Sequence, residues 1–260
     1  GISIGGDLAS VSDVMLNADG NLEILGNARF RQGDLNSRQG AILLQGDTAA
    51  NSLRLSAAQS IDLTGASVID GNLVAQAGDI RFGQLDVGGD LSAHADANLR
   101  FLGDSRIAGQ VDLSADSAID QQADMTLAQS LNIDITGDFL NEGRLAVAGN
   151  LDIAARNIRS NLVADGGLIA SGHLHAQAGG NIALGQQGDF TAVDGIELTA
   201  VNLSHAGQMQ SGGPLNFSGN SFSNSGLVAA ESINLASQLS NSGTLYGGRI
   251  EVSDYSHNSG

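Results

Sequence analysis

Two histidines flanked by carboxylates are the residues of this sequence best placed to do chemistry. His173 and His175 are two positions apart, and Asp152 and Glu197 lie roughly one repeat of the sequence before and after them. In equivalent positions of successive repeats, the two carboxylates would favour the charged form of His175. With His173, the group could then hold a metal ion or serve in acid–base chemistry. A solvated row of polar side chains is the interpretation we favour, because the inserts near residues 160–170 disturb the spacing.

Asparagines recur near the carboxyl-terminal end at a fixed interval. Asn224, Asn241 and Asn258 are each followed by Ser and Gly. Stacked Asn side chains can hydrogen-bond to one another and to corner backbones, while Gly supplies a left-handed turn conformation. We therefore predict a structural role for these corners.

Charged residues form a second recurring row. Its members are Glu23, Leu43, Asp62, Arg81, Arg100 and Asp120. Stacking would place the two arginines beside Asp62 and Asp120, in a ladder that fixes register but contributes only about 0–1 kcal/mol per exposed pair. The other histidines, His94, His205 and His257, have no partner that the sequence identifies.

An enzyme and a calcium-binding protein are the two chemical alternatives. The 28 acidic residues will form carboxylate pairs by chance, so such pairs do not identify a glycosidase. Sugar-cleaving grooves usually stack rings on Trp or Tyr, and this chain has no Trp and only Tyr246 and Tyr255. The Gly-Gly-x-Gly-x-Asp repeat of calcium-binding β-rolls is absent, although nonspecific cation binding at acidic corners stays open. We predict no enzyme, no catalytic residue, no cofactor and no metal ligand.

Composition excludes further classes of function. The net charge of −17, with 11 basic residues that are all Arg, repels nucleic acids and anionic membranes. The absence of Cys removes disulfides and thiolate chemistry and suits passage through an oxidising compartment. No stretch approaches 18 uninterrupted apolar residues, so we predict no membrane insertion of this segment.

The elements that must position these residues come from a repeat of about twenty residues. The phrase at 53–65 returns at 91–103, and each phrase holds two alternating apolar pairs, as in Leu73/Ala75 and Ile80/Phe82. Alternation is the period of a strand, and a fixed short period indicates stacked units. The repeats start at Val14, Leu35, Leu53, Leu73, Leu91, Val111, Leu131, Leu151, Leu174, Ile196, Leu215, Ile233 and Ile250.

A third, weaker apolar position completes each repeat. It is filled by Phe30, Val68, Leu85, Ile107, Leu127, Leu145, Met209, Leu227 and Leu245. We therefore predict an all-β fold, a right-handed parallel β-helix with three short strands per coil and about 13 coils of roughly 20 residues. Residues 1–260 form a single repeat segment, which we expect to be a fragment of a much longer chain.

The residue between the two apolar positions of the first strand in each repeat should face outward. These residues are Arg54, Val74, Ser92, Asp112, Asn132, Asp152, His175, Glu197, Asn216, Asn234 and Glu251.

The repeat phrases resemble a known family. Gly-Asp-Leu at 33–35, Gly-Gly-Asp-Leu at 88–91, Gly-Asn-Leu at 149–151 and the Asn-Ser-Gly corners are similar to the repeats of filamentous-haemagglutinin-type exoproteins. These are long bacterial surface proteins exported by two-partner secretion, which include adhesins and the shafts of contact-dependent growth-inhibition effectors. The Asn-Pro motifs of the family's secretion domain, a toxin-like tail and Arg-Gly-Asp are missing, so the resemblance is to the shaft.

The resemblance implies a function, a location and partners. We expect a structural or adhesive shaft of a secreted or surface-displayed bacterial exoprotein, which presents adhesive or effector regions to host or neighbouring cells. The expected partner during export is the outer-membrane two-partner-secretion transporter, and a cell-surface receptor or glycan is a further candidate. A receptor- or glycan-binding module within the shaft is the alternative. Its loops would lie in the lengthened coils at 151–195, at Asp165-Gly-Gly167 and Gln186-Gln-Gly-Asp189.

Overall fold

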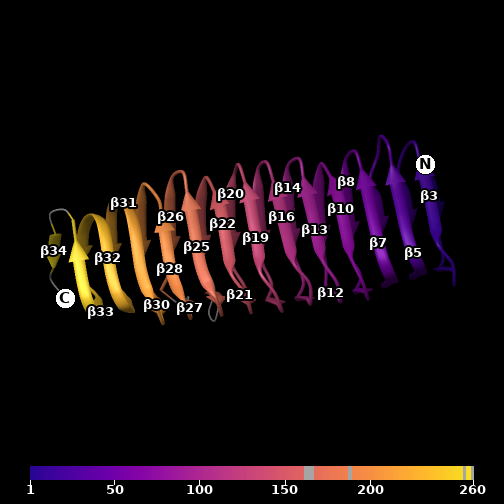
Figure 1. Ribbon diagram of the computed structural model, residues 1–260. Helices are drawn as coiled ribbons and strands as arrows, with labels where there is room; N and C mark the ends of the chain where they lie inside the picture. Colours follow the sequence, from indigo (N-terminus) through magenta and orange to yellow (C-terminus); the bar gives the residue numbers. More distant parts are fainter. Residues whose placement is uncertain (161–166, 187–188, 254–255, 259–260) are drawn as a thin grey trace. The chain divides into compact units, whose positions relative to one another are not determined.

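The fold consists of parallel β-strands stacked in successive turns. The computed structural model describes residues 1–160, 167–186, 189–253 and 256–258. Within these residues every regular element is a strand, and the chain divides into two compact units, residues 1–128 and 129–260. Together the units contain about 12 turns spaced by roughly 20 residues, which confirms the predicted parallel β-helix. Figure 1 shows the strands of successive turns side by side within each unit.

Each turn of unit 1 contributes one strand to each of three faces. Face 1 holds β3 (Val14–Ala18), β10 (Leu73–Ala77), β13 (Leu91–Ala95) and β16 (Val111–Ala115). Face 2 holds β1 (Ile2–Ile4), β4 (Leu22–Ile24), β6 (Ile42–Leu44), β8 (Ser60–Leu63), β11 (Asp79–Phe82), β14 (Asn98–Phe101) and β17 (Ala118–Gln121). Face 3 holds β2 (Leu8–Ala9), β9 (Ser67–Ile69), β12 (Leu85–Val87), β15 (Ser105–Ile107) and β18 (Met125–Leu127). The longer β5 (Ala28–Ser37) and β7 (Thr48–Ala57) run from face 3 onto face 1 of the next turn.

Unit 2 repeats the arrangement. Its face 1 holds β19 (Leu131–Ile135), β22 (Leu151–Ala155), β25 (His173–Ala178) and β28 (Gly195–Thr199). Face 2 holds β20 (Asp138–Asn141), β23 (Asn157–Ser160), β26 (Asn181–Leu184), β29 (Asn202–His205) and β34 (Ser256–Asn258). Face 3 holds β21 (Arg144–Val147), β24 (Gly167–Ala170), β27 (Asp189–Ala192) and β30 (Gln208–Ser211). The long β31 (Pro214–Asn224), β32 (Leu227–Asn241) and β33 (Thr244–Val252) continue across corners.

Alternation along each strand builds the core inside the turns. In β13, Leu91, Ala93 and Ala95 are buried, while Ser92 and His94 face solvent. Apolar residues in register also stack between turns, as for the Phe82 and Phe101 rings, whose centroids are 5.3 Å apart. Because one turn covers the apolar layer of the next, stability is shared between neighbours and a single turn cannot fold alone.

The predicted phase is wrong at Leu35. Leu35 pairs with Leu16 and Leu55, and the residue opposite Val14 and Leu53 is Gly33. A Cβ on Gly33 would lie 2.4 Å from Phe30 Cε2, so the Phe30 ring fills the space that a side chain would need. The alternation allows either Gly33 or Leu35 to lie opposite Val14 and Leu53. The packing of Phe30 against Gly33 decides between these two registers.

Further errors concern the third strand of a turn, where Val87 and not Leu85 continues the position of Ile107. Val68 is 48% exposed, whereas Ser67 and Ile69 on either side of it are buried. Leu227 is half-buried, and its neighbour Val228 occupies the core. Where adjacent residues of similar size compete for an inward position, the register with neighbouring turns determines which one is buried.

The corners are held by side-chain oxygens that accept backbone hydrogens from the following turn. Asn72 Oδ1 accepts from Asp90 N, and Asp90 Oδ1 accepts from Gln110 N, both at 2.9 Å. The same arrangement links Asp7, Asn27 and Asp47 at another corner of unit 1. Asp and Asn are therefore frequent at the corners because they satisfy backbone groups where the strand ladder is interrupted.

Candidate functional site

The His175 row on face 1 of unit 2 has the predicted register. His175 pairs with Asp152 of the preceding turn and with Glu197 of the following one. Its Nδ1 lies 3.5 Å from Asp152 Oδ1, and the two side chains are 43% and 51% exposed. No cluster of three metal-ligating side chains occurs among the described residues. The arrangement is a solvated pair on an outer surface, whose expected contribution to stability is small.

A second histidine on an outer face has partners that the sequence analysis did not identify. His94 Nδ1 lies 2.7 Å from Ser114 Oγ, and His94 Nε2 lies 3.4 Å from Asp96 Oδ1. The order Ser–His–Asp is that of a hydrolytic triad. However, His94 and Ser114 lie on the paired strands β13 and β16, and Asp96 follows the end of β13 with its N–H bonded to Ala77 O, so these backbone N–H groups are engaged between turns and do not form an oxyanion hole. We interpret this cluster as part of an outer polar ladder.

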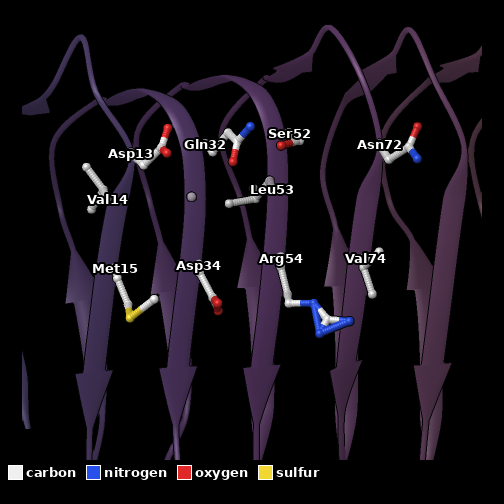
Figure 2. A pocket seen from close by; sticks show the side chains of 11 residues that line it. Asp13, Val14, Met15, Gln32, Asp34, Ser52, Leu53, Arg54, Asn72 and Val74 are labelled. Carbon is white, nitrogen blue, oxygen red and sulfur yellow. The ribbon is translucent and has the colours of Figure 1, made fainter.

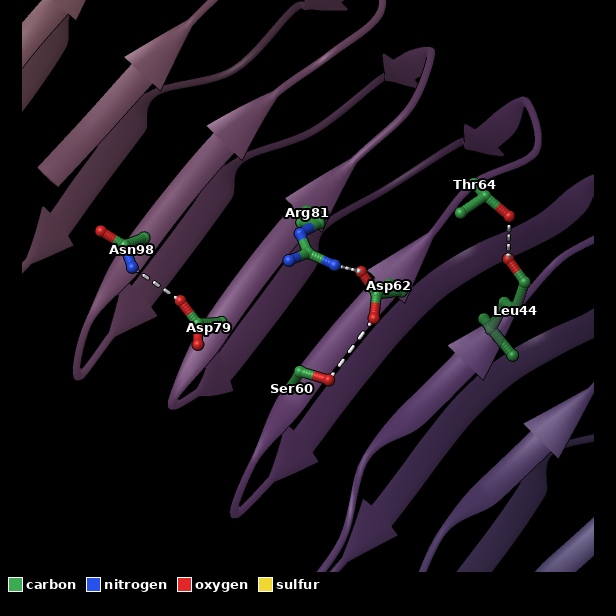
Figure 3. A network of polar contacts seen from close by, with 7 residues as sticks. All are labelled: Leu44, Ser60, Asp62, Thr64, Asp79, Arg81 and Asn98. Carbon is green, nitrogen blue, oxygen red and sulfur yellow. Dashed lines mark hydrogen bonds and ion pairs between the residues drawn. The ribbon is translucent and has the colours of Figure 1, made fainter.

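The predicted charge row lies on face 2 of unit 1. Asp62, Arg81, Arg100 and Asp120 occupy consecutive turns in register. Arg81 Nη1 is 3.4 Å from Asp62 Oδ1, which confirms that ion pair (Figure 3). Figure 3 also shows the parallel contact between Asn98 Nδ2 and Asp79 Oδ1, at 2.9 Å. These contacts join successive turns.

A shallow pocket of about 400 Å³ crosses face 1 of unit 1. Figure 2 shows its two outward rows and its floor. One row is Asp13, Gln32, Ser52 and Asn72; the other is Met15, Asp34, Arg54 and Val74; Val14, Gly33 and Leu53 form the floor. Met15 is 69% exposed, so the pocket offers an apolar contact beside charged groups. Sequence reasoning missed this surface because its members come from four turns and each is unremarkable alone.

A buried polar column runs through face 2 of unit 2. It consists of His205, Asn224 and Asn241 in consecutive turns. Asn141 and Ser160 hold the same inward position in earlier turns, and the apolar Leu184 lies in register between Ser160 and His205. All five polar residues are at most 3% exposed. Asn224 Nδ2 donates to Asn241 Oδ1 at 2.7 Å, which confirms the predicted asparagine ladder for this pair. Asn258 continues the register opposite Asn241, and its side chain lies outside the described residues.

His205 is the ionisable member of this column. Its Nδ1 lies 2.8 Å from Asn224 Oδ1, and its Nε2 is buried and has no hydrogen-bond partner among the described residues. Burial lowers the pKa of the His205 imidazole, against smaller opposing effects of Asn224 and the Gln208 backbone. The sequence signal that marks this position is the His-x-Gly triplet at 205–207, which has the spacing of the two Asn-x-Gly corners that follow it.

The loops proposed for binding fall on segments that are largely not described. Asp165 and Gly166 of the first loop, and Gln187 and Gly188 of the second, lie outside the described residues. Gly167 is the first residue of β24, and Gln186 follows β26 as an exposed residue.

Comparisons with known proteins add no assignment. No family model, curated protein or solved structure matches the sequence or the fold of this chain. Within the described residues, no helix is long and apolar enough to span a membrane.

Proposed function

We propose that this chain is a shaft segment of a secreted or surface-displayed bacterial exoprotein, which spans distance and presents adhesive or effector regions to other cells. A non-enzymatic structural role is supported by the construction of each unit. Turn after turn repeats the same three strands, and the outward rows carry polar side chains that contact the next turn.

The observation that carries the proposal is the continuity of the outward rows. On face 1 of unit 1, Asp34, Arg54, Val74, Ser92 and Asp112 occupy one position in consecutive turns. Because the register is kept while the outward residue type changes at every turn, such turns can be added one after another to lengthen the stack. The filamentous-haemagglutinin-type resemblance rests on the repeat phrases and is part of the proposal.

Cell binding by the purified, fluorescently labelled chain tests the spacer function. A spacer predicts no saturable binding to host epithelial cells or Gram-negative bacteria, from protein shown by circular dichroism to be folded. Saturable binding to one cell type would contradict it. Repeating the assay in EDTA separates a cation-dependent contact at the acidic corners from a direct one.

A receptor- or glycan-binding module is the second candidate, and the face 1 pocket of unit 1 favours it. If the pocket binds a receptor, Met15→Ser and Val74→Ser together should reduce saturable binding at least about tenfold, the equivalent of 1.4 kcal/mol. Val68→Ser removes an exposed apolar residue from face 3 of the same unit and is the matched control. Equal binding by all three proteins would exclude the pocket.

The location and the export partner are proposed from the resemblance. We expect the parent protein to reach the cell surface through an outer-membrane two-partner-secretion transporter. Antibodies against this chain should then label intact bacteria as strongly as permeabilised ones. Labelling that requires permeabilisation, or that persists unchanged after deletion of the transporter, would contradict this route.

A further inference from the structure

The buried column of unit 2 has a defined direction of hydrogen bonding. Gly226 N donates to Asn224 Oδ1 at 3.1 Å, and Asn224 Nδ2 donates to both Gly226 O and Asn241 Oδ1. Asn224 Oδ1 is therefore an acceptor, so His205 Nδ1 must carry the hydrogen in their 2.8 Å contact. The neutral imidazole then keeps its lone pair on Nε2, the buried atom that has no partner.

No compensating charge faces this imidazole. Residues 198–230 contain no Asp, Glu, Lys or Arg. Among the neighbouring elements, β26, β29, β30 and β31 likewise carry none, while Glu197 of β28 and Glu231 of β32 are exposed. The His173 and His175 side chains of β25 are exposed and half-buried, and the side chain of Asp189 in β27 lies outside the described residues. A proton bound at Nε2 would therefore place a positive charge in the core without a carboxylate to balance it, and only the polar groups of Asn224 and the Gln208 backbone would favour it.

From this geometry we propose that His205 makes the turns around it in unit 2 sensitive to protonation. The column is intact with a neutral imidazole, and protonation in an acidic environment destabilises the neighbouring turns. In the folded state the imidazole resists protonation, whereas in the unfolded or opened chain it titrates near its usual value of about 6.5. Since the opened state binds more protons, its stability relative to the closed state rises as pH falls through this range. His94 and His175 occupy outward positions of their strands and are not part of an inward column.

His205→Asn is the matched variant, because the column itself shows how Asn fits there. Residues 205–207 are His-Ala-Gly, and the next two turns have Asn-Ser-Gly at the same register. An Asn at 205 would donate to Asn224 Oδ1 as Asn224 donates to Asn241. It keeps the ladder and removes only the ionisable group, so it is expected to fold.

Thermal unfolding of the full chain at pH 7.5 and pH 5.0 provides the test. The wild-type chain is expected to lose at least about 2 °C more of its Tm on acidification than the His205→Asn chain, which shares all 28 carboxylates. His94→Asn, at the exposed site, should lose as much as wild type. A pH-dependent loss that is equal in wild type and His205→Asn would overturn the proposal.

Nitrogen NMR of the histidine side chains supplies a second readout that does not depend on unfolding. We expect the His205 imidazole to be the Nδ1–H tautomer at pH 7.5 and to remain neutral as the pH falls below about 6.5, the usual pKa of a histidine. Backbone signals of residues 196–243 should broaden or shift as His205 gains its proton, while those of residues 20–120 stay unchanged. If His205 gains its proton at or above pH 6.5, the usual histidine pKa, and these turns do not respond, the proposal is wrong.

Discussion

At the scale of single residues, the polar side chains of this protein divide into a buried set and a solvated set. Asn224 is 1% exposed and bonds to groups in two neighbouring turns, whereas Asn216 lies on the outer face and accepts from Asn234 Nδ2 at 2.8 Å. The two contacts look alike in geometry. They differ in how much stability is lost when one partner is removed, because a buried group that loses its partner cannot form a hydrogen bond with water instead.

Asn224→Ala should therefore lower the free energy of unfolding by about 2–3 kcal/mol, since it removes the acceptor of the buried His205 Nδ1 and the hydrogen bonds that Asn224 makes to Asn241 and Gly226. Asn216→Ala, on the outer face, should change it by less than about 0.5 kcal/mol. Urea unfolding of both variants measures the difference. Losses of similar size would show that the column is hydrated.

Outer ion pairs affect protonation more than stability. Arg156 Nε donates to Asp138 Oδ1 at 3.0 Å, and this hydrogen bond, opposed by desolvation and supported by Asn157, lowers the pKa of Asp138. Because the folded-state pKa lies below the unfolded value, the stabilisation is present above the unfolded value and is lost as pH falls through the folded one.

Arg156→Met should raise the pKa of Asp138 toward 3.8, its ordinary value. Carboxyl-carbon NMR titration measures this shift. In the wild-type chain the pKa should also rise with added salt, because the pair is exposed to screening. An unchanged Asp138 titration in the variant would mean that Asn157 and Arg159, and not Arg156, lower its pKa.

At the scale of elements, the corners and the strands satisfy the backbone in different ways. The strands pair with the preceding and following turns, while the corner side chains accept the N–H groups that this ladder leaves out. Asp90 is representative, since its side chain accepts from Gln110 N and its own N–H donates to Asn72.

Asp90→Ala should therefore destabilise unit 1 by about 1 kcal/mol, similar to the loss of a helix N-cap, which satisfies a backbone N–H in the same manner. Asp90→Asn keeps an acceptor oxygen and should be close to neutral. Equilibrium unfolding of the two variants, with hydrogen exchange of the Gln110 amide, distinguishes them. If Asn is as harmful as Ala, the charge and not the acceptor is what matters.

At the scale of the whole molecule, the repeat predicts that turns are removable units. In unit 1, Leu91 is in register with Leu73 and with Val111. Deletion of residues 91–110 joins Asp90 to Val111 and preserves every inward column. Deletion of residues 91–100 removes about half a turn and places face 1 residues against face 2.

The chain without residues 91–110 should keep its β-type circular dichroism spectrum and a cooperative transition, with a Tm lowered by a few degrees because one interface is lost. The chain without residues 91–100 should be much less stable or fail to fold. A cooperative, native-like transition in the half-turn deletion would contradict the register described for unit 1.

The sequence by itself determined the architecture of this protein, because alternation and a twenty-residue spacing are satisfied together only by stacked parallel turns. It also located the His175 row, the Arg81 row and the asparagine ladder, since residues one repeat apart must become neighbours. The tertiary structure decided which of two nearby residues takes an inward position, because the repeat alone allows both. Gly33 rather than Leu35 continues the Val14 position because the Phe30 ring fills the space, and Val68 faces outward because the register places Ile69 opposite the buried Val87. It also decided that His205 is buried beside Asn224 while His94 is solvated, since the burial of a histidine depends on which side of its strand it occupies.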